Sequence, residues 1–180
     1  KSSKLVHLTG DKSLSKRDFT RVIKPLNDFG VKIISNKGKL PLKVKGTNYL
    51  RPIDYCELKG SSQIKSCIML AALNTPGTTK IKCKPSRNHT ELLFQYLKLP
   101  IKVKKKRNFD LIEIEGQHNF KAFDYHIPSD ISSASFFIIL TLLAKNSQIL
   151  LKNINVNRSR TGIIDILKKM NSKKILNNKR

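Results

Sequence analysis

The stretch at residues 60–73, GSSQIKSCIMLAAL, places two serines and a glutamine directly before an apolar run. The apolar run predicts a buried helix from about Ser62 to Leu73. Capping alone would explain Ser61 and Ser62, because Ser is a common N-cap residue. A helix N-terminus also attracts anions, since its free N–H groups and its dipole are positive there. The stretch by itself leaves both interpretations open.

The residues that follow predict a strand, a second helix and a pair of strands. Thr75-Pro76-Gly77 ends the first helix, and Thr78–Cys83 alternates as a strand does. Asn88 and Glu91 fit a capping box that opens the second helix. The inward residues expected of that helix are Leu92, Leu93, Tyr96 and Leu97, and the paired strands expected after Pro100 are Ile101–Lys104 and Leu111–Glu115.

The same order of elements recurs after roughly 70 residues, which is typical of repeated supersecondary units. A helix is expected from Ile131 to near Asn146, then a strand at Gln148–Lys152 and another at Lys174–Leu176. Between these strands, a helix is marked by Ile163, Ile164, Leu167 and Met170.

The start of the chain fits the tail of an earlier copy. It contains strands at Leu5–Leu8 and Val31–Ile34 and a helix marked by Phe19, Val22, Ile23 and Leu26. We therefore expect about two and a half copies of a helix–strand–helix–strand–strand unit.

Aligning the copies brings their basic turns together. Lys16-Arg17, Ser86-Arg87 and Arg158-Ser159-Arg160 all fall at or just before the second helix of a unit. An arginine recurring beside a helix N-terminus indicates an anion site as readily as a solvated charge. The first helices open with Ser61-Ser62 in one copy and Ser132-Ser133 in the next, where Asp130 is expected to serve as the N-cap.

The net charge of +24 admits three interpretations. A basic surface suits nucleic acid through phosphate contacts, and it also suits an enzyme that gathers small anionic substrates. The third interpretation is compositional, because Lys, Asn and Ile are abundant together, as AT-rich genomes favour. The lysines form no single stripe and aromatic residues make up only 7% of the chain, so we expect no nucleic-acid partner.

Several other classes of protein are disfavoured. Of the 180 residues 39% are apolar, enough for a core in one or two domains. The longest apolar stretch, Phe136–Ala144, is too short to span a membrane. The histidines show no metal-ligand spacing, so no metal is expected. Cys56, Cys67 and Cys83 form no C-x-x-C motif and predict reduced core residues of a cytoplasmic protein.

Five segments, taken as a set and in order, resemble the EPSP synthase family. They are LTGDKSLSKRDFTRVIKPLNDFGVKI (residues 8–33), GSSQIKSCIMLAAL (60–73), PSRNHTELL (85–93), IPSDISSASFFI (127–138) and NRSRTGIIDILKKM (157–170). The resemblance covers nearly all of the chain, but only the middle of the family's longer sequence.

The resemblance implies a fold of the α/β class (α+β type), an inside-out α/β barrel of six βαβαββ-like units, three per lobe. This chain would hold about two and a half of the six units. Residues 1–123 would belong to one lobe, residues 124–130 would cross between lobes, and residues 131–180 would begin the other lobe. The family's active site lies in the cleft between lobes.

The resemblance also implies a reaction. The family transfers the enolpyruvyl group of phosphoenolpyruvate to the 5-hydroxyl of shikimate 3-phosphate and releases phosphate, without a metal or organic cofactor. Its full-length members are expected to be cytoplasmic monomers that act in aromatic amino acid biosynthesis.

Site residues carry over by motif. Ser61, Ser62, Gln63, Ser86, Arg87 and His89 would bind shikimate 3-phosphate, Arg17 and Gln63 would bind phosphoenolpyruvate, and Asp130 would be a hinge residue. The family's acid–base residues have no counterpart in these 180 residues, so the chain is expected to be inactive alone. The positions that depart from the family's pattern are Asp18, Asn88, Ser129 and Asn171-Ser172.

Two related activities and one unrelated function remain as alternatives. A UDP-N-acetylglucosamine enolpyruvyl transferase shares the fold but does not normally carry the GSSQIKS and PSRNHTE pair. An RNA 3′-terminal phosphate cyclase would need a nucleotide site that the sequence does not show. A basic nucleic-acid-binding module would bind with a steep dependence on salt.

Overall fold

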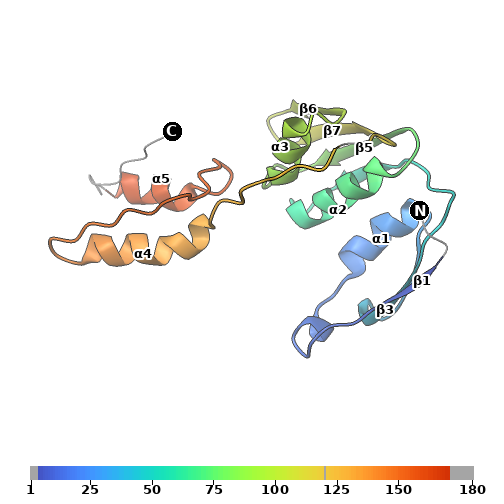
Figure 1. Ribbon diagram of the computed structural model, residues 1–180, viewed down its shortest axis with the longest axis horizontal. Helices are drawn as coiled ribbons and strands as arrows, with labels where there is room; N and C mark the ends of the chain where they lie inside the picture. The colour runs from blue at the N-terminus through green and yellow to red at the C-terminus, as the bar shows by residue number, and fades with distance from the viewer. Residues whose placement is uncertain (1–3, 120, 171–180) are drawn as a thin grey trace. The chain divides into compact units, whose positions relative to one another are not determined.

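The computed structural model describes residues 4–119 and 121–170. The chain divides into two compact units, Lys1–Lys121 and Ala122–Arg180 (Figure 1). The first unit contains two β-sheets with their helices, and the second contains two helices and an isolated β-bridge.

The first sheet is antiparallel, with the strand order β1-β3-β2. Its strands are β1 (Leu5–Leu8), β2 (Lys32–Asn36) and β3 (Lys39–Lys45). The connection from β1 to β2 contains a short 3₁₀ helix, η1 (Leu14–Lys16), and α1 (Thr20–Asp28).

The second sheet has the strand order β4-β5-β7-β6. β4 (Asp54–Glu57) runs parallel to β5 (Thr78–Cys83), while β7 (Asp110–Glu115) pairs antiparallel with both β5 and β6 (Ile101–Lys105). Two helices follow the parallel strands: α2 (Ser62–Leu73) follows β4, and α3 (His89–Tyr96) follows β5. α2 packs on β5 and β7, and α3 packs on β6.

The core of this unit follows the alternation of the strands. In β5 the inward residues are Thr79, Ile81 and Cys83, and the outward residues are exposed. Side chains of α2 close the core from the helix side. The fully buried apolar members are Phe29, Ile68, Met69, Ala72, Ile112 and Ile114.

The two sheets repeat one topology. The order β1-β3-β2 corresponds to β5-β7-β6, with antiparallel pairing in both sheets and a helix between the first two strands of each. α2 begins at Ser62 and α4 at Ile131, an offset of 69 residues. The repeat predicted from the sequence is therefore confirmed for the two sheets of the first unit, whereas the described residues of the second unit contain only the two helices of the predicted copy. β4 has no counterpart among the described strands of the first sheet, so one edge of β1 is left without a partner there.

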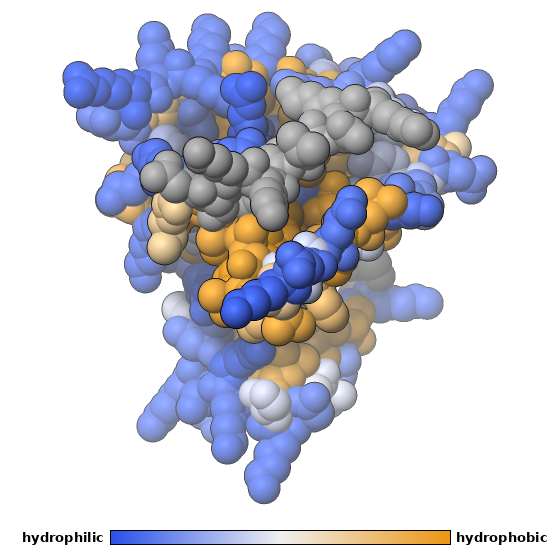
Figure 2. Space-filling view, turned by 90° about the vertical axis from the view of Figure 1, so that its left-hand side faces the viewer, coloured by the Kyte–Doolittle hydropathy of each residue, from blue (hydrophilic) through white to orange (hydrophobic). Residues whose placement is uncertain are grey.

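In the second unit, α4 (Ile131–Leu143) and α5 (Gly162–Lys169) share a small core of Ile131, Ala134 and Ile164. Figure 2 shows hydrophobic residues exposed on the face that it views. The large apolar residues of α4 that are exposed are Phe136, Phe137, Ile139, Leu140 and Leu143.

One predicted strand of this unit is wrong. Gln148–Lys152 has no strand structure, and the backbone pairs only at a parallel bridge between Ser129 and Ile154. A strand requires a neighbouring strand to accept its hydrogen bonds, and among residues 122–170 none is present. The strand expected at Lys174–Leu176 lies outside the described residues.

Three details of the first unit also differ from expectation. Asn88 makes no side-chain capping bond to α3, and Glu91 instead pairs with a lysine of α2. Phe94 is the buried apolar residue of α3, whereas Leu92 and Tyr96 are exposed. Cys56 is exposed on β4, so it is not a core residue, and all three cysteines are free thiols.

Candidate functional site

The loop before α2 is shaped by a buried carboxylate. Glu57, 2% exposed at the end of β4, accepts hydrogen bonds from the backbone N–H groups of Lys59 (2.9 Å) and Gly60 (2.7 Å). Gly60 has φ +70°, which a residue with a side chain adopts only with strain. The chain then enters α2 at Ser61, whose Oγ accepts from the N–H of Ile64 at 3.4 Å. Of the two interpretations that the sequence left open for Ser61, capping is confirmed.

α3 begins close to α2 because β4 and β5 are parallel neighbours. Both strands lead into helices from their carboxyl ends, so the two helix N-termini lie at one edge of the sheet. This is where ligands bind in open α/β sheets, because free N–H groups and positive dipole ends converge there.

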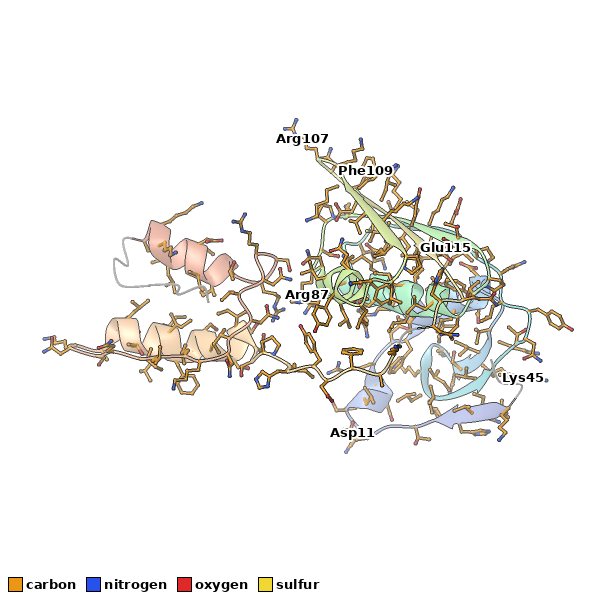
Figure 3. The ribbon with its side chains drawn as sticks, turned by 45° about the horizontal axis from the view of Figure 1, so that its top comes forward. Asp11, Lys45, Arg87, Arg107, Phe109 and Glu115 are labelled. Atoms are coloured by element: carbon orange, nitrogen blue, oxygen red, sulfur yellow. The ribbon has the colours of Figure 1, made fainter. Side chains whose placement is uncertain are left out.

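A pocket of ≈ 160 Å³ lies between these two helix starts. Arg87, one of its lining residues, precedes α3 (Figure 3). α2 contributes Ser62, Gln63 and Ser66, the turn before α3 contributes Arg87, and α3 itself contributes His89 and Thr90. A larger hollow of ≈ 330 Å³ lies along β4, β5 and β7 and contains none of the predicted site residues.

Four of the predicted site residues therefore share one pocket: Ser62, Gln63, Arg87 and His89. Ser61 caps α2 beside the pocket, and the Oγ of Ser86 is buried without a hydrogen-bond partner among the described residues. Arg17 follows η1, is exposed and is not part of the pocket lining. Asp130 lies in the second unit.

Ser66 and Thr90 also line the pocket, although the sequence interpretation did not select them. Their hydroxyl oxygens are 2.7 Å apart, in a hydrogen bond that joins α2 to α3. Helical spacing could have identified Ser66, which is four residues after Ser62 and therefore on the same face of α2.

Arg87 gives the pocket a positive charge. Its side chain is exposed, and no residue of 4–119 or 121–170 forms an ion pair with it. Next to the pocket, the fully buried Lys65 is already neutralised, because its Nζ lies 2.5 Å from Oε1 of the buried Glu91. Arg87 is thus the arginine of this pocket that is available to an anion.

In the second unit, the helix start that corresponds to the start of α2 is that of α4, and there a carboxylate of the chain itself binds the arginine. Asp130 caps α4 as Ser61 caps α2, and its carboxylate accepts from the N–H of Ser132 at 3.1 Å. Arg160, in the turn before α5, donates to Asp130 Oδ1 at 2.9 Å and to Ser132 Oγ at 2.5 Å. The bond from the Ser132 backbone, and then Arg160, hold the pKa of Asp130 below its usual value.

Asp18, one of the positions that depart from the pattern of the family that the chain resembles, stabilises the start of α1. Its Oδ1 accepts from the N–H of Thr20 at 2.8 Å, and hydrogen bonds with Thr20 lower the pKa of its carboxyl. The backbone of Ser129 forms the isolated β-bridge. Its N–H donates to Asn153 O at 2.7 Å, and its carbonyl oxygen accepts from the N–H of Asn155 at 2.9 Å. Both substitutions fit their local backbone.

The described part of the chain gives little support for a cysteine nucleophile, a metal site or a membrane-spanning helix. Burial raises the pKa of the Cys83 thiol to about 11 and also raises the pKa of Cys67, which opposes formation of a nucleophilic thiolate. Within residues 4–119 and 121–170, no three His, Cys, Asp or Glu side chains gather as metal ligands would. None of the helices in these residues has the length and hydrophobicity needed to cross a bilayer.

Comparison with known proteins gives one consistent result. Residues 1–179 match the family model for EPSP synthase (3-phosphoshikimate 1-carboxyvinyltransferase). The 3-phosphoshikimate 1-carboxyvinyltransferase of Ruthia magnifica is 45% identical over 174 residues, which are 96% of this chain and 39% of the relative. That of Clostridium tetani is 41% identical over 91% of this chain and 36% of its own length.

Solved structures agree with the sequence comparison. An EPSP synthase from Acinetobacter baumannii superposes with a TM-score of 0.83 at 34% identity, over 99% of this chain and 40% of that chain. The chain thus spans about two fifths of the length of the relatives that it matches.

Proposed function

The chain belongs to the EPSP synthase family, and from this premise we propose that it carries the shikimate 3-phosphate site of a 3-phosphoshikimate 1-carboxyvinyltransferase. In the proposed reaction, the 5-hydroxyl of shikimate 3-phosphate takes the enolpyruvyl group of phosphoenolpyruvate, and phosphate leaves.

The observation that carries the proposal is the pocket between α2 and α3, with Arg87 at its edge. Two helix N-termini and an arginine without a carboxylate partner among the described residues favour a dianionic group such as a phosphate ester. The buried hydroxyl of Ser86, beside Arg87 in the chain, supplies a further donor that lacks a partner among those residues. An unsatisfied buried donor is costly, and an incoming phosphate oxygen would relieve that cost.

The second unit supports the same interpretation. At the equivalent helix start, Arg160 binds the carboxylate of Asp130, so an anion supplied by the chain fills the position. In the first unit the equivalent residue is the neutral Ser61, which leaves Arg87 for an anion from solution.

The remaining residues are assigned by family resemblance. Ser61, Ser62 and Gln63 would contact shikimate 3-phosphate from the α2 side, and His89 would lie near its ring. Arg17 and Gln63 would bind phosphoenolpyruvate. Asp130 would act as a hinge residue, and its ion pair with Arg160 would be the contact that changes when ligand binds.

The proposal extends to the architecture of the whole enzyme. Residues 1–123 would belong to one lobe, residues 124–130 to the crossover and residues 131–180 to the other lobe. The described elements would form about two and a half of the six units of an inside-out barrel. The complete protein would be a cytoplasmic monomer.

We expect the 180-residue chain to bind shikimate 3-phosphate and to bind unphosphorylated shikimate far more weakly. Arg87→Gln should weaken shikimate 3-phosphate binding by about tenfold to a hundredfold, because a charge-assisted hydrogen bond is worth about 1.5–3 kcal/mol. Isothermal titration calorimetry measures both affinities, and amide chemical shifts should move at Ser62 and Gln63.

Arg107→Gln is the matched control, because it removes the same charge from the turn between β6 and β7 (Figure 3). It should leave the affinity for shikimate 3-phosphate unchanged. Equal losses in both variants would show that only net charge matters. Tight, salt-dependent binding of an oligonucleotide without any effect of shikimate 3-phosphate would replace the proposal with a nucleic-acid-binding function.

A further inference from the structure

We propose that the hydroxyl pair of Ser66 and Thr90 donates a hydrogen bond to the anion in the pocket, as an additional ligand contact. The inference rests on the proposed function, since it concerns the same pocket. It adds two residues to those that the family motifs assign.

Counting hydrogens leads to this role. The oxygens of Ser66 and Thr90 are 2.7 Å apart, and either hydroxyl can be the donor of the bond between them. Two hydroxyls carry two hydrogens, and the bond between them uses one. The second hydrogen belongs to the hydroxyl that accepts this bond, and it remains available for another acceptor.

That acceptor is best supplied by a ligand. Both residues line the pocket, and no other hydrogen bond joins either side chain to a residue of the described chain. The pocket's arginine and its two helix starts select for negatively charged oxygens, which are strong acceptors. In a hydrogen-bonded pair the first bond also polarises the second hydroxyl, which strengthens its donation.

The neighbouring residues fix the pair in place. Lys65 precedes Ser66 on α2, and Glu91 follows Thr90 on α3, so the buried ion pair lies next to the hydroxyl pair. Two successive links between the same helices restrict how far the helices can separate. The donor is therefore held in position before the ligand arrives, which reduces the entropy lost on binding.

The test is the double variant Ser66→Ala/Thr90→Val, which removes both hydroxyls with little change of shape. The affinity of the full chain for shikimate 3-phosphate should fall about tenfold, the loss expected for one hydrogen bond to a charged group. Each single variant should lose much less, because the remaining hydroxyl then directs its one hydrogen to the ligand. The double effect should thus exceed the product of the two single effects.

Thr90→Ser retains the hydroxyl and should bind as the parent does. Thr141→Val is the matched control, because the Thr141 hydroxyl on α4 donates to Phe137 O at 2.8 Å and Thr141 is not one of the residues that line the pocket. Thermal unfolding of each variant shows whether the fold is intact. A double variant that folds and keeps its affinity within twofold of the parent would overturn the proposal, as would single losses as large as the double loss.

A titration with inorganic phosphate identifies the ligand oxygen. Parallel losses for inorganic phosphate and shikimate 3-phosphate assign the donor to the phosphate group, whereas a loss for shikimate 3-phosphate alone assigns it to another oxygen of that ligand. If the parent chain bound no shikimate 3-phosphate at all, the proposed function itself would fail. A parent that binds and responds to Arg87→Gln, but not to the double variant, would refute this inference alone.

Discussion

At Asp130 the side chain has two partners, the N–H of Ser132 and the guanidinium of Arg160. Both favour the charged carboxylate, so its pKa is lowered in the folded protein. A lowered pKa means that these contacts stabilise the fold above the ordinary value of 3.8, and that the stabilisation is lost as the pH falls through the lowered pKa.

We therefore expect the Asp130 carboxyl to titrate with a midpoint below 3.8. Arg160→Gln should move that midpoint upward, because it removes the positive partner and leaves the capping bond. Carbon-13 NMR of the side-chain carboxyl measures both values. Asp18, also lowered by hydrogen bonds at a helix start, serves as the internal reference and should not respond to Arg160→Gln.

Single residues show where the sequence sufficed and where it did not. Ser61 and Asp130 were predicted as caps and are caps, since a cap bonds within its own helix start. Asn88 and Glu91 also fit a capping pattern, but Glu91 pairs with Lys65, a residue 26 positions earlier. Local spacing could not reveal a partner that only the tertiary fold brings close.

Among the contacts between helices, the buried Lys65–Glu91 ion pair is expected to contribute most to the stability of the fold. Glu91→Gln should destabilise the first unit by about 3–5 kcal/mol, because it leaves the Lys65 ammonium buried without its counter-charge. The double variant Lys65→Met/Glu91→Leu should recover most of the loss, since apolar side chains can fill the same space. Urea unfolding measures both values.

Glu115→Gln provides the surface control on β7 and should change stability by less than about 0.5 kcal/mol. If Glu91→Gln and Glu115→Gln had equal effects, the buried pair would have no special role. If the double variant were as unstable as the single one, the pair would contribute through its shape rather than through its charge.

Elements with strong local signals were predicted well. α2 has an apolar run and β5 and β7 have alternating apolar residues, with Gly or Pro near their ends, and all three form close to their expected bounds. β3 and β4 were missed. β4 has only four residues, and its parallel partner β5 lies beyond a whole helix in the sequence. The strand expected at Gln148–Lys152 failed for the opposite reason, because its local pattern had no neighbouring strand to pair with.

For the whole molecule, the repeat was the most informative prediction. The recurring order of elements, read from the sequence, appears as the shared topology of β1-β3-β2 and β5-β7-β6. The pocket could be predicted in part, because the turn with Arg87 aligns with a basic turn in each of the other repeat units. The sequence did not indicate that Asp130 would fill the equivalent position in the second unit, since Arg160 is 30 residues away.

We expect the purified 180-residue chain to release no measurable phosphate from phosphoenolpyruvate and shikimate 3-phosphate. The resemblance assigns the family's acid–base residues to segments that these residues do not include. Adding a separate polypeptide that carries the remaining family sequence should restore turnover. A phosphate-release assay run beside the full-length Clostridium tetani relative provides the scale. Phosphate release by the chain alone above the background without protein would refute the expectation.

β1 is the outer strand of the first sheet, and its edge away from β3 has no partner strand among the described residues. This open edge should affect how the purified protein behaves in solution. Leu5, Val6 and Leu8 are 51%, 47% and 44% exposed, and no described strand pairs with that edge. An extended backbone with unpaired N–H and C=O groups and apolar side chains is a template for a strand of another molecule. Concentrated solutions of the chain should therefore aggregate from this end, and a lysine at Val6 would be the substitution most suited to keeping the preparation dispersed.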